Sequence, residues 1–338
     1  MSRVAEDLIG RWFLARRHHG VDDTMYFAVV DGRGEVIASR GYAHARFDGR
    51  GALIGMLKQM GVTFRPPQIG QGRRAPGWWA LLRSRPWRQP STPIPDWREP
   101  VNADRDRTDG FAGLQIYRFR REATMALEQQ AAEQGVSLTA LILAAEHRAI
   151  SALLCQTGSR GSWFVPVDLR GSVSLSRDSM NHCSGVFVTL ADHGQGSDVH
   201  RQLKARLKAG AHWWYWFQAR LLARLGQAVV NRAYASLARP GRYLGSYSML
   251  GRWQVDWRGS DFPEDAALVC CGPGSPTYPF ANGVILTNGC LTLAMKPDPS
   301  LGLSADQSRT LMARWLEELT VTQSGAQPLS VAQEQAVC

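Results

Sequence analysis

One run of the sequence, residues 25–60, sets two extended segments and a helix around a single histidine. In order it predicts a strand, a turn, a returning strand and a helix, over residues 25–31, 32–34, 35–42 and 52–60. His44 is therefore expected just past the end of a strand. Asp48 and Gly49 are expected in the tight turn that enters the helix. Such turns commonly present side chains to a cleft.

His44 and Asp48 together offer a general base and a residue to hold it. A neutral imidazole is well suited to take a proton from a hydroxyl or amine near neutral pH, provided that a neighbour fixes its ring. Asp48 is expected to do this indirectly. The spacing H-x-x-x-D is also common by chance, so an ordinary surface or core histidine is the alternative. A second match, from His18 to Asp23, lacks the following glycine and helix, and we expect a polar loop there.

The length and composition allow a large folded unit. With 338 residues, of which 44% are hydrophobic, the chain can bury a core of one large domain or two coupled subdomains. No apolar stretch approaches the roughly 20 residues that span a bilayer, and residues 1–7 do not resemble a secretory signal. We therefore expect a cytoplasmic protein.

The six cysteines show neither a C-x-x-C pair nor a Cys/His spacing typical of zinc, so no metal site is predicted. Cys270 and Cys271 end an apolar segment, where adjacent cysteines are more often packing residues than nucleophiles. Reduced, mostly buried thiols are expected.

The formal net charge of +10 favours an anionic partner, such as a phosphorylated cofactor, an acidic carrier protein, a membrane surface or nucleic acid. The basic residues are dispersed, and no zinc finger, RNA-binding aromatic signature or compact basic helix is present, which weighs against nucleic acid. No phosphate-binding glycine loop of the two common kinds is present either.

The rest of the chain alternates helices and strands. Residues 65–109, rich in Pro, Arg and Trp, predict a long surface excursion, and residues 324–338 predict a loose tail. Strands are expected over residues 114–120, 162–170, 180–190, 244–251, 267–271, 283–287 and 291–295. Helices are expected over residues 122–134, 137–150, 198–238 and 304–319.

Five aromatic residues follow His212 in the long helical region, more than one helix face can hold. One interpretation is an element at a membrane interface or along an acyl chain, with Trp213 and Trp216 contacting substrate. The other is a helix packed on two sides.

The order of these motifs resembles the acyltransferase superfamily that includes chloramphenicol acetyltransferase, peptide-synthetase condensation domains, wax ester synthases and plant BAHD enzymes. The resemblance covers about residues 25–320. The motifs that carry it are the H-H-x-x-x-D-G pattern at residues 43–49, a V-D-x-R-like strand end at 167–170, an N-x-x-G-like pair with one extra residue at Asn181 and Gly185, and an S-N-L-G-like strand at 246–251.

The resemblance implies roles for individual residues. His44 would deprotonate an acceptor hydroxyl or amine, which attacks an acyl thioester on coenzyme A or a carrier protein. Asp48, followed by Gly49, would pair with Arg170 and fix the turn that aims the histidine. Ser246 or Ser248 would donate a hydrogen bond to the oxyanion. Asn181, Gly185, Trp213 and Trp216 complete the candidate site, which needs no permanently bound cofactor.

The resemblance also implies a fold. We expect an α/β protein, an α+β two-layer sandwich of the chloramphenicol acetyltransferase type, with two related subdomains and the site at their junction. The boundaries would enclose residues 1–110, 111–323 and the tail 324–338.

The sequence departs from the family in three places. Ala43 replaces the first histidine of the pattern, and only Asp261-Phe262 matches the BAHD motif D-F-G-W-G. His44 also comes early, because relatives usually carry a much longer segment before this motif. The N-terminal subdomain is therefore expected to be incomplete, completed by another chain, or lost together with activity.

Three functions fit these features. The leading one is a cytoplasmic acyltransferase acting in lipid or secondary metabolite biosynthesis, with an apolar acceptor or acyl chain favoured by the twelve tryptophans. The second is a catalytically degenerate member of the fold that acts as a binding or scaffold protein. The third is peripheral binding to lipid, without chemistry, through the Trp/Arg segments.

Overall fold

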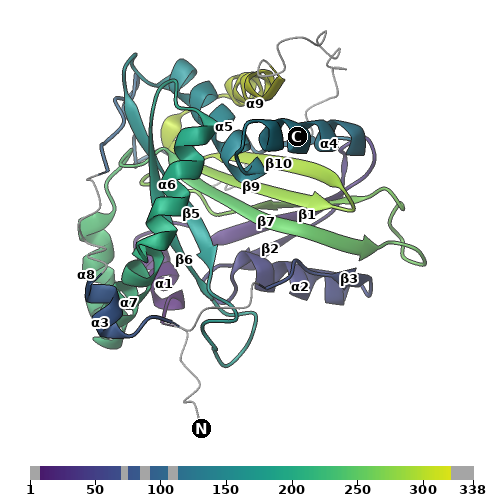
Figure 1. Cartoon of the computed structure of the whole chain (residues 1–338). Helices are drawn as coiled ribbons and strands as arrows, with labels where there is room; N and C mark the ends of the chain where they lie inside the picture. Colours follow the sequence, from purple (N-terminus) through teal and green to yellow (C-terminus); the bar gives the residue numbers. More distant parts are fainter. Residues whose placement is uncertain (1–7, 70–74, 84–91, 106–112, 321–338) are drawn as a thin grey trace.

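The computed structural model describes residues 8–69, 75–83, 92–105 and 113–320. The strands of this part form two sheets (Figure 1), a small one in the order β2-β1-β8 and a large one in the order β4-β10-β9-β7-β5-β6, with β3 paired to β7. The strands are β1 (Thr24–Val30), β2 (Val36–Ala43), β3 (Thr63–Arg65), β4 (Gln115–Arg118), β5 (Arg160–Asp168), β6 (Cys183–Ala191), β7 (Gly245–Asp256), β8 (Ala267–Cys271), β9 (Phe280–Thr287) and β10 (Cys290–Pro297).

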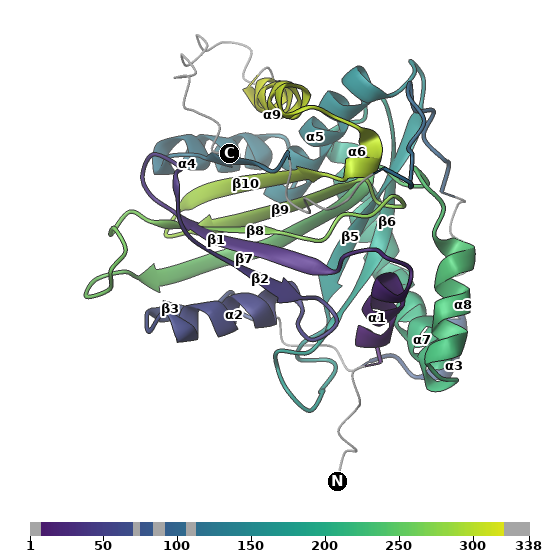
Figure 2. The ribbon, with the colours of Figure 1, turned by 180° about the vertical axis from the view of Figure 1, so that it is seen from behind.

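Helices pack on these sheets from both sides. In Figure 1, α4, α5 and α9 lie above the large sheet and α2 lies below, while α3, α7 and α8 gather at the lower left. Figure 2, the view from behind, places α1 beside α7 and α8. The helices are α1 (Gly10–His18), α2 (Gly49–Gln59), α3 (Trp78–Arg83), α4 (Arg121–Glu133), α5 (Leu138–Leu154), α6 (Gly196–Lys208), α7 (Ala211–Arg224), α8 (Gln227–Leu237) and α9 (Ala305–Thr320).

The main core lies between α5 and the large sheet. Helix α5 is apolar along most of its length, so it is buried by α9 on one side and by the strands on the other. Ser137 caps its first turn by accepting a hydrogen bond from the backbone N–H of Ala140 at 3.2 Å. A second core joins α2 to β1 and the far end of β7.

The predicted hairpin and the helix after it are present. Strands β1 and β2 pair antiparallel, with Thr24 opposite Ala43. Helix α2 begins at Gly49, earlier than the apolar spacing alone indicated, because the Asp48 carboxylate accepts the backbone N–H of Gly51 at 2.8 Å and caps the first turn. The mixed α/β class expected from the sequence is confirmed.

The long helical region predicted over residues 198–238 is divided into three helices. Gly210 (φ +72°) and Gly226 (φ +109°) stand at the two breaks. These backbone angles are accessible to glycine and strained for other residues. The chain therefore turns at each glycine, and α6, α7 and α8 are separate helices instead of one.

Helix α1 is an element that the sequence patterns did not predict.

Among the described residues no single helix is long and apolar enough to cross a bilayer, and α4 with α5 passes that test only as a pair bent by 96°. The predicted subdomain boundary after residue 110 and the tail 324–338 fall outside the described residues.

Candidate active site

His44 lies in the turn after β2, held by the chain just before β1. Its backbone N–H donates to the Asp23 carbonyl at 2.9 Å, and the next N–H, of Ala45, donates to the Asp23 carboxylate at 2.7 Å. Asp23 is fully buried and forms an ion pair with Arg17. The loop expected here is present over residues 19–23, after His18 at the end of α1, and through Asp23 it also supports the His44 turn.

Asn181 fixes the orientation of the His44 ring. Its side-chain N–H donates to the His44 carbonyl at 3.0 Å, so its amide oxygen faces the ring and lies 3.0 Å from Nδ1 of His44. An amide oxygen only accepts, and Nδ1 must therefore carry the proton of the neutral ring. This leaves the lone pair on Nε2, which hydrogen-bonds to none of the described residues.

The surroundings of His44 favour the neutral imidazole. Burial lowers its pKa below the ordinary value of 6.5, and the nearby Arg16 acts in the same direction. Its own backbone, the Asp48 carboxylate and Asn181 act in the opposite direction without cancelling this shift. The Phe13 ring of α1 stacks on the imidazole, with centroids 3.7 Å apart and planes 11° from parallel. His44 is thus neutral and held flat near pH 7.

Asp48 turns away from the histidine and into a buried network. Its Oδ1 accepts from Arg170 at 2.8 Å, and its Oδ2 accepts from the backbone N–H of His182 at 3.0 Å. Burial by itself lowers the pKa of Arg170, but its hydrogen bond to Asp48 and the charge there raise that pKa above the ordinary value. Asp168 adds a second contact to Arg170 at 3.1 Å.

This network fastens the loop before β6 to the start of α2. The Asp48 N–H donates to the Ser179 carbonyl at 3.2 Å. A Cβ on Gly51 would lie 2.5 Å from the Ser179 backbone, so only glycine fits this approach. Because the loop continues directly into Asn181, the ion pair that anchors it also positions the amide that holds His44.

The predicted oxyanion donors lie on β7. Ser246 and Ser248 face Ala281 and Gly283 of the neighbouring β9, on the sheet side opposite Tyr247, which is buried among the residues that pack with α5. Both serines are partly exposed. Gly49 approaches the same strand, since a Cβ there would meet the Leu250 side chain at 3.2 Å. The part of the chain that the structure describes shows no hydrogen bond between either serine and His44, so their role stays a prediction.

The other predicted substrate contacts are packed side chains. Trp213 and Trp216 are 8% and 3% exposed, in a cluster with Leu81 of α3 and Leu169. Gly185 lies under Phe164, whose ring would be 2.3 Å from a Cβ at that position. Their proposed contacts with substrate stay predictions.

Sequence reasoning missed Phe13 and Asp23. Phe13 gave no signal, since its partner is distant in the chain and its helix was not predicted. A signal for Asp23 was present in the sequence. Asp23 comes just before β1 and His44 comes just after β2, so the antiparallel pairing of these strands places the two residues opposite each other.

The adjacent cysteines are packing residues in the structure. Cys270 and Cys271 are buried in β8, and burial raises the pKa of the Cys271 thiol to about 12. No cluster of three metal-ligating side chains occurs within the described ranges.

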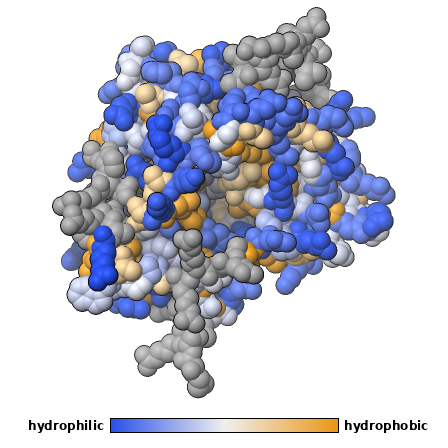
Figure 3. Space-filling view, in the orientation of Figure 1, coloured by the Kyte–Doolittle hydropathy of each residue, from blue (hydrophilic) through white to orange (hydrophobic). Residues whose placement is uncertain are grey.

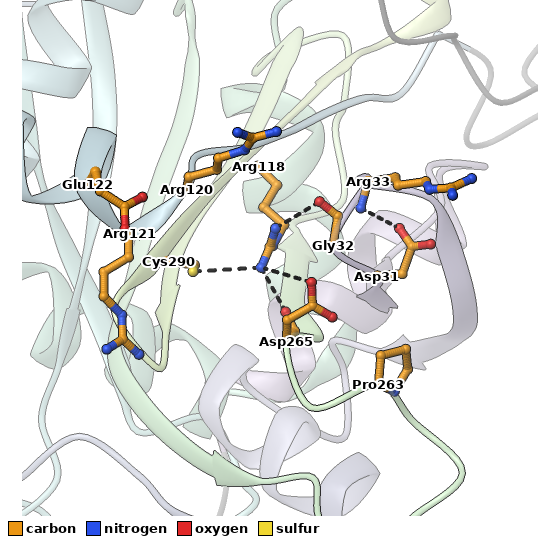
Figure 4. Close-up of a pocket in the computed structure, with 10 residues that line it drawn as sticks. All are labelled: Asp31, Gly32, Arg33, Arg118, Arg120, Arg121, Glu122, Pro263, Asp265 and Cys290. Carbon is orange, nitrogen blue, oxygen red and sulfur yellow. Dashed lines mark hydrogen bonds and ion pairs between the residues drawn. The ribbon is translucent and has the colours of Figure 1, made fainter.

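A pocket of about 600 Å³ opens at the far end of the β1–β2 hairpin, about 23 Å along β2 from His44. Figure 4 shows that Arg33, Arg120 and Arg121 point in different directions, while Arg118 is engaged by the Gly32 carbonyl and by Asp265. The pocket is therefore not a convergent anion site.

No protein-family model matches this chain, and no curated protein matches its sequence. Among solved structures, polyketide synthase associated protein 5 from Mycobacterium tuberculosis is similar with a TM-score of 0.50 and 15% identity, covering 87% of this chain and 75% of that one. The enacyloxin polyketide synthase structure, described for condensation domain-mediated chain release, gives 0.47 at 13% identity, with coverages of 86% and 59%. A trichothecene 15-O-acetyltransferase from Fusarium sporotrichioides gives 0.42 at 12% identity, with coverages of 72% and 51%.

This chain thus spans from about half to three quarters of the length of these structures. At identities of 12 to 15% a structural match is evidence of a shared fold and not of a shared function. The statement about the fold rests on polyketide synthase associated protein 5, which has the TM-score of 0.50. The chain shares its fold with polyketide synthase associated protein 5, and condensation domains and an acetyltransferase are among its other structural matches.

Proposed function

We propose that this protein transfers an acyl group from a thioester, carried by coenzyme A or an acyl carrier protein, to a hydroxyl or amine acceptor. The observation that carries the proposal is the state of His44. Its Nδ1 donates a hydrogen bond to the Asn181 amide oxygen, and its Nε2 keeps a lone pair. Burial also lowers the pKa of the imidazole. This is the arrangement that a general base requires near neutral pH.

The reaction follows from that lone pair. Nε2 of His44 takes the proton of the acceptor as its oxygen or nitrogen bonds to the thioester carbonyl carbon. The carbonyl becomes an oxyanion, for which Ser246 or Ser248 is the proposed donor. The oxyanion then collapses, the carbon–sulfur bond breaks, and the thiolate takes the proton back from Nε2. Asp48 and Arg170 remain charged throughout and act as positioning residues.

The donor is expected to be recognised by charge. The phosphates of coenzyme A, or the acidic surface of a carrier protein, would be drawn to a chain of net charge +10. Trp213 and Trp216 remain the proposed apolar contacts for an acyl chain or apolar acceptor.

A second candidate function is a binding protein of the same fold without catalysis. The stacking of Phe13 on His44 favours it, because that contact covers one face of the ring. The two functions differ in whether an acceptor can reach Nε2 of His44, which thiol release by the native chain would report. A purely structural pair would leave both the native chain and Phe13→Ala inactive and the variant less stable, whereas a catalytic His44 gives measurable thiol release in the native chain.

The proposal is tested by measuring thiol release from a panel of acyl-CoAs and an acyl-loaded carrier protein, with mixed alcohol and amine acceptors. Acceptor-dependent release is expected with one donor class. Ser246→Ala and Ser248→Ala then identify the oxyanion donor, since its loss should lower kcat by about 100-fold while the other serine changes little. Release at the background rate with every donor would contradict the proposal.

A further inference from the structure

The helices at the lower left of Figure 1 carry positive charge without any negative charge. Helices α1, α3, α7 and α8 contain seven arginines and no aspartate or glutamate. Residues 199–255 hold ten lysines and arginines and again no acidic residue, a charge equal to the whole net charge of the chain, +10. Five of these ten residues lie in α6 and β7, and the other five lie in α7, α8 and the segment that follows α8. The four helices named first are therefore basic without any carboxylate of their own, although the basic residues looked dispersed along the sequence.

An apolar stripe runs along this basic side. Trp214, Leu221 and Leu225 fall on one face of α7 by helical spacing, and the two leucines are 59% and 64% exposed. Trp78 of α3 packs beside the same helix, with its ring centroid 6.2 Å from that of Trp214. The next residue, Trp79, is 76% exposed.

Arginines flank the stripe. The Arg220 guanidinium lies 5.2 Å from the ring centroid of Trp216, and Arg224, one turn further along α7, is exposed. Arg83 is exposed at the end of α3. Figure 3 shows apolar and strongly hydrophilic residues side by side at the lower left, where α3 and α7 lie in Figure 1. We call Trp78, Trp79, Leu221, Leu225, Arg83 and Arg224 the α3–α7 face.

We propose that the α3–α7 face docks on an anionic lipid bilayer. Trp and Leu side chains enter the boundary between headgroups and acyl chains, while arginines beside them contact the lipid phosphates. The absence of any carboxylate from the four helices removes the repulsion that an anionic surface would otherwise exert. An acidic protein could bind this face through charge alone. The two neighbouring tryptophans and the two exposed leucines favour a lipid bilayer instead, because a bilayer also takes up apolar side chains. This docking does not depend on the proposed acyl transfer.

The experiment is co-sedimentation of the full chain with two kinds of vesicle. One kind is phosphatidylcholine alone, and the other contains about 30% phosphatidylserine. Binding is expected with the anionic vesicles and should fall as salt is raised. Arg224→Gln should weaken it about fivefold, the equivalent of about 1 kcal/mol per basic residue at such a surface. Trp79→Ala should weaken it about tenfold through the lost apolar burial.

Matched controls lie on other parts of the surface. Arg33→Gln removes the same charge in the β1–β2 turn, and Met125→Ala removes a 60% exposed apolar side chain from α4. Both should bind as the native chain does. The proposal is overturned if anionic vesicles do not sediment the protein, or if the controls lose as much binding as the variants of the α3–α7 face. It is also overturned if Trp79→Ala instead abolishes self-association or binding to polyglutamate while vesicles have no effect.

Discussion

The amide of Asn181 contacts both the ring and the backbone of His44, accepting from Nδ1 and donating to the carbonyl, each at 3.0 Å. One side chain thereby sets the tautomer and the rotation of the imidazole together. Asp48, the residue paired with His44 in the sequence motif, acts one step further away. It anchors the loop that carries Asn181 through Arg170 and the N–H of His182.

Replacing Asn181 by alanine should release the ring and lower kcat by about 10- to 100-fold, with little change in KM, because the tautomer with its lone pair on Nε2 is no longer enforced. Nitrogen-15 NMR of the histidine side chains is the direct measurement. It should show one fixed neutral tautomer for His44 in the native protein and a mixture in the variant. A fixed tautomer in both proteins would contradict the role assigned to Asn181.

Replacing Asp48 by asparagine should destabilise the fold by about 3 kcal/mol, since Arg170 stays buried without its principal counter-charge. Urea unfolding monitored by tryptophan fluorescence measures this. The matched control is Asp198→Asn, which breaks the exposed ion pair with Arg201 and should change the free energy of unfolding by less than about 1 kcal/mol. Equal effects from the two substitutions would show that the buried pair does not anchor the site.

Stability should fall as the pH is lowered from 6.5 toward 4, because of His147. Burial lowers the pKa of His147 to about 4, and its Nδ1 accepts from the Trp163 indole at 3.2 Å. The unfolded histidine, with a pKa of about 6.5, gains a proton in this range while the folded one does not. The contribution of His147 to the free energy of unfolding is complete above pH 6.5, and about 3 kcal/mol of it is lost by pH 4.

Unfolding of the native chain and of His147→Gln, followed across this range, isolates that contribution. The variant should be less stable at pH 7 and show a shallower dependence on pH. His18→Ala, at an exposed position, should keep the native slope. A native slope in His147→Gln would assign the pH dependence to other groups.

Gly185→Ala should destabilise the fold by about 1 to 3 kcal/mol, because the new methyl group would meet the Phe164 ring at 2.3 Å. Phe164→Leu should restore part of the loss in the double variant. Gly55→Ala is the opposite case: nothing lies within 4 Å of its Cβ position in α2, and it should stabilise by up to about 1 kcal/mol. Thermal unfolding compares them, and a Gly185→Ala protein as stable as the native chain would remove the packing explanation.

Local patterns predicted most of the elements but not α1, β3 or α3. The hairpin, α2 and α5 follow from spacing that neighbouring residues carry themselves. Helix α1 depends on contacts more than 200 residues away, such as the Trp12 indole with the Ala219 carbonyl at 3.1 Å and Arg11 with the Ala223 carbonyl at 2.8 Å. Its sequence has no apolar face of its own to indicate this.

The candidate site could be predicted in part, for a related reason. His44, Asp48, Arg170 and Asn181 were singled out together through their resemblance to a known motif order, and the structure brings them together. The resemblance implied the pairing of Asp48 with Arg170. The contact of Asn181 with the His44 ring could not be read from the sequence, because it depends on which way the amide points. Asp23 was missed because its place opposite His44 exists only once the strands have paired.

The most direct test of the central claim compares His44→Ala with His18→Ala in the thiol-release assay, using the acceptor and donor that give the highest rate with the native chain. His18 belongs to the other H-x-x-x-D-type match and serves as the control. Circular dichroism should first show that both variants keep the native fold. If His44 is the general base, acceptor-dependent release is lost in His44→Ala, by at least about 100-fold, and is kept in His18→Ala. Equal release by His44→Ala and the native chain would contradict the account.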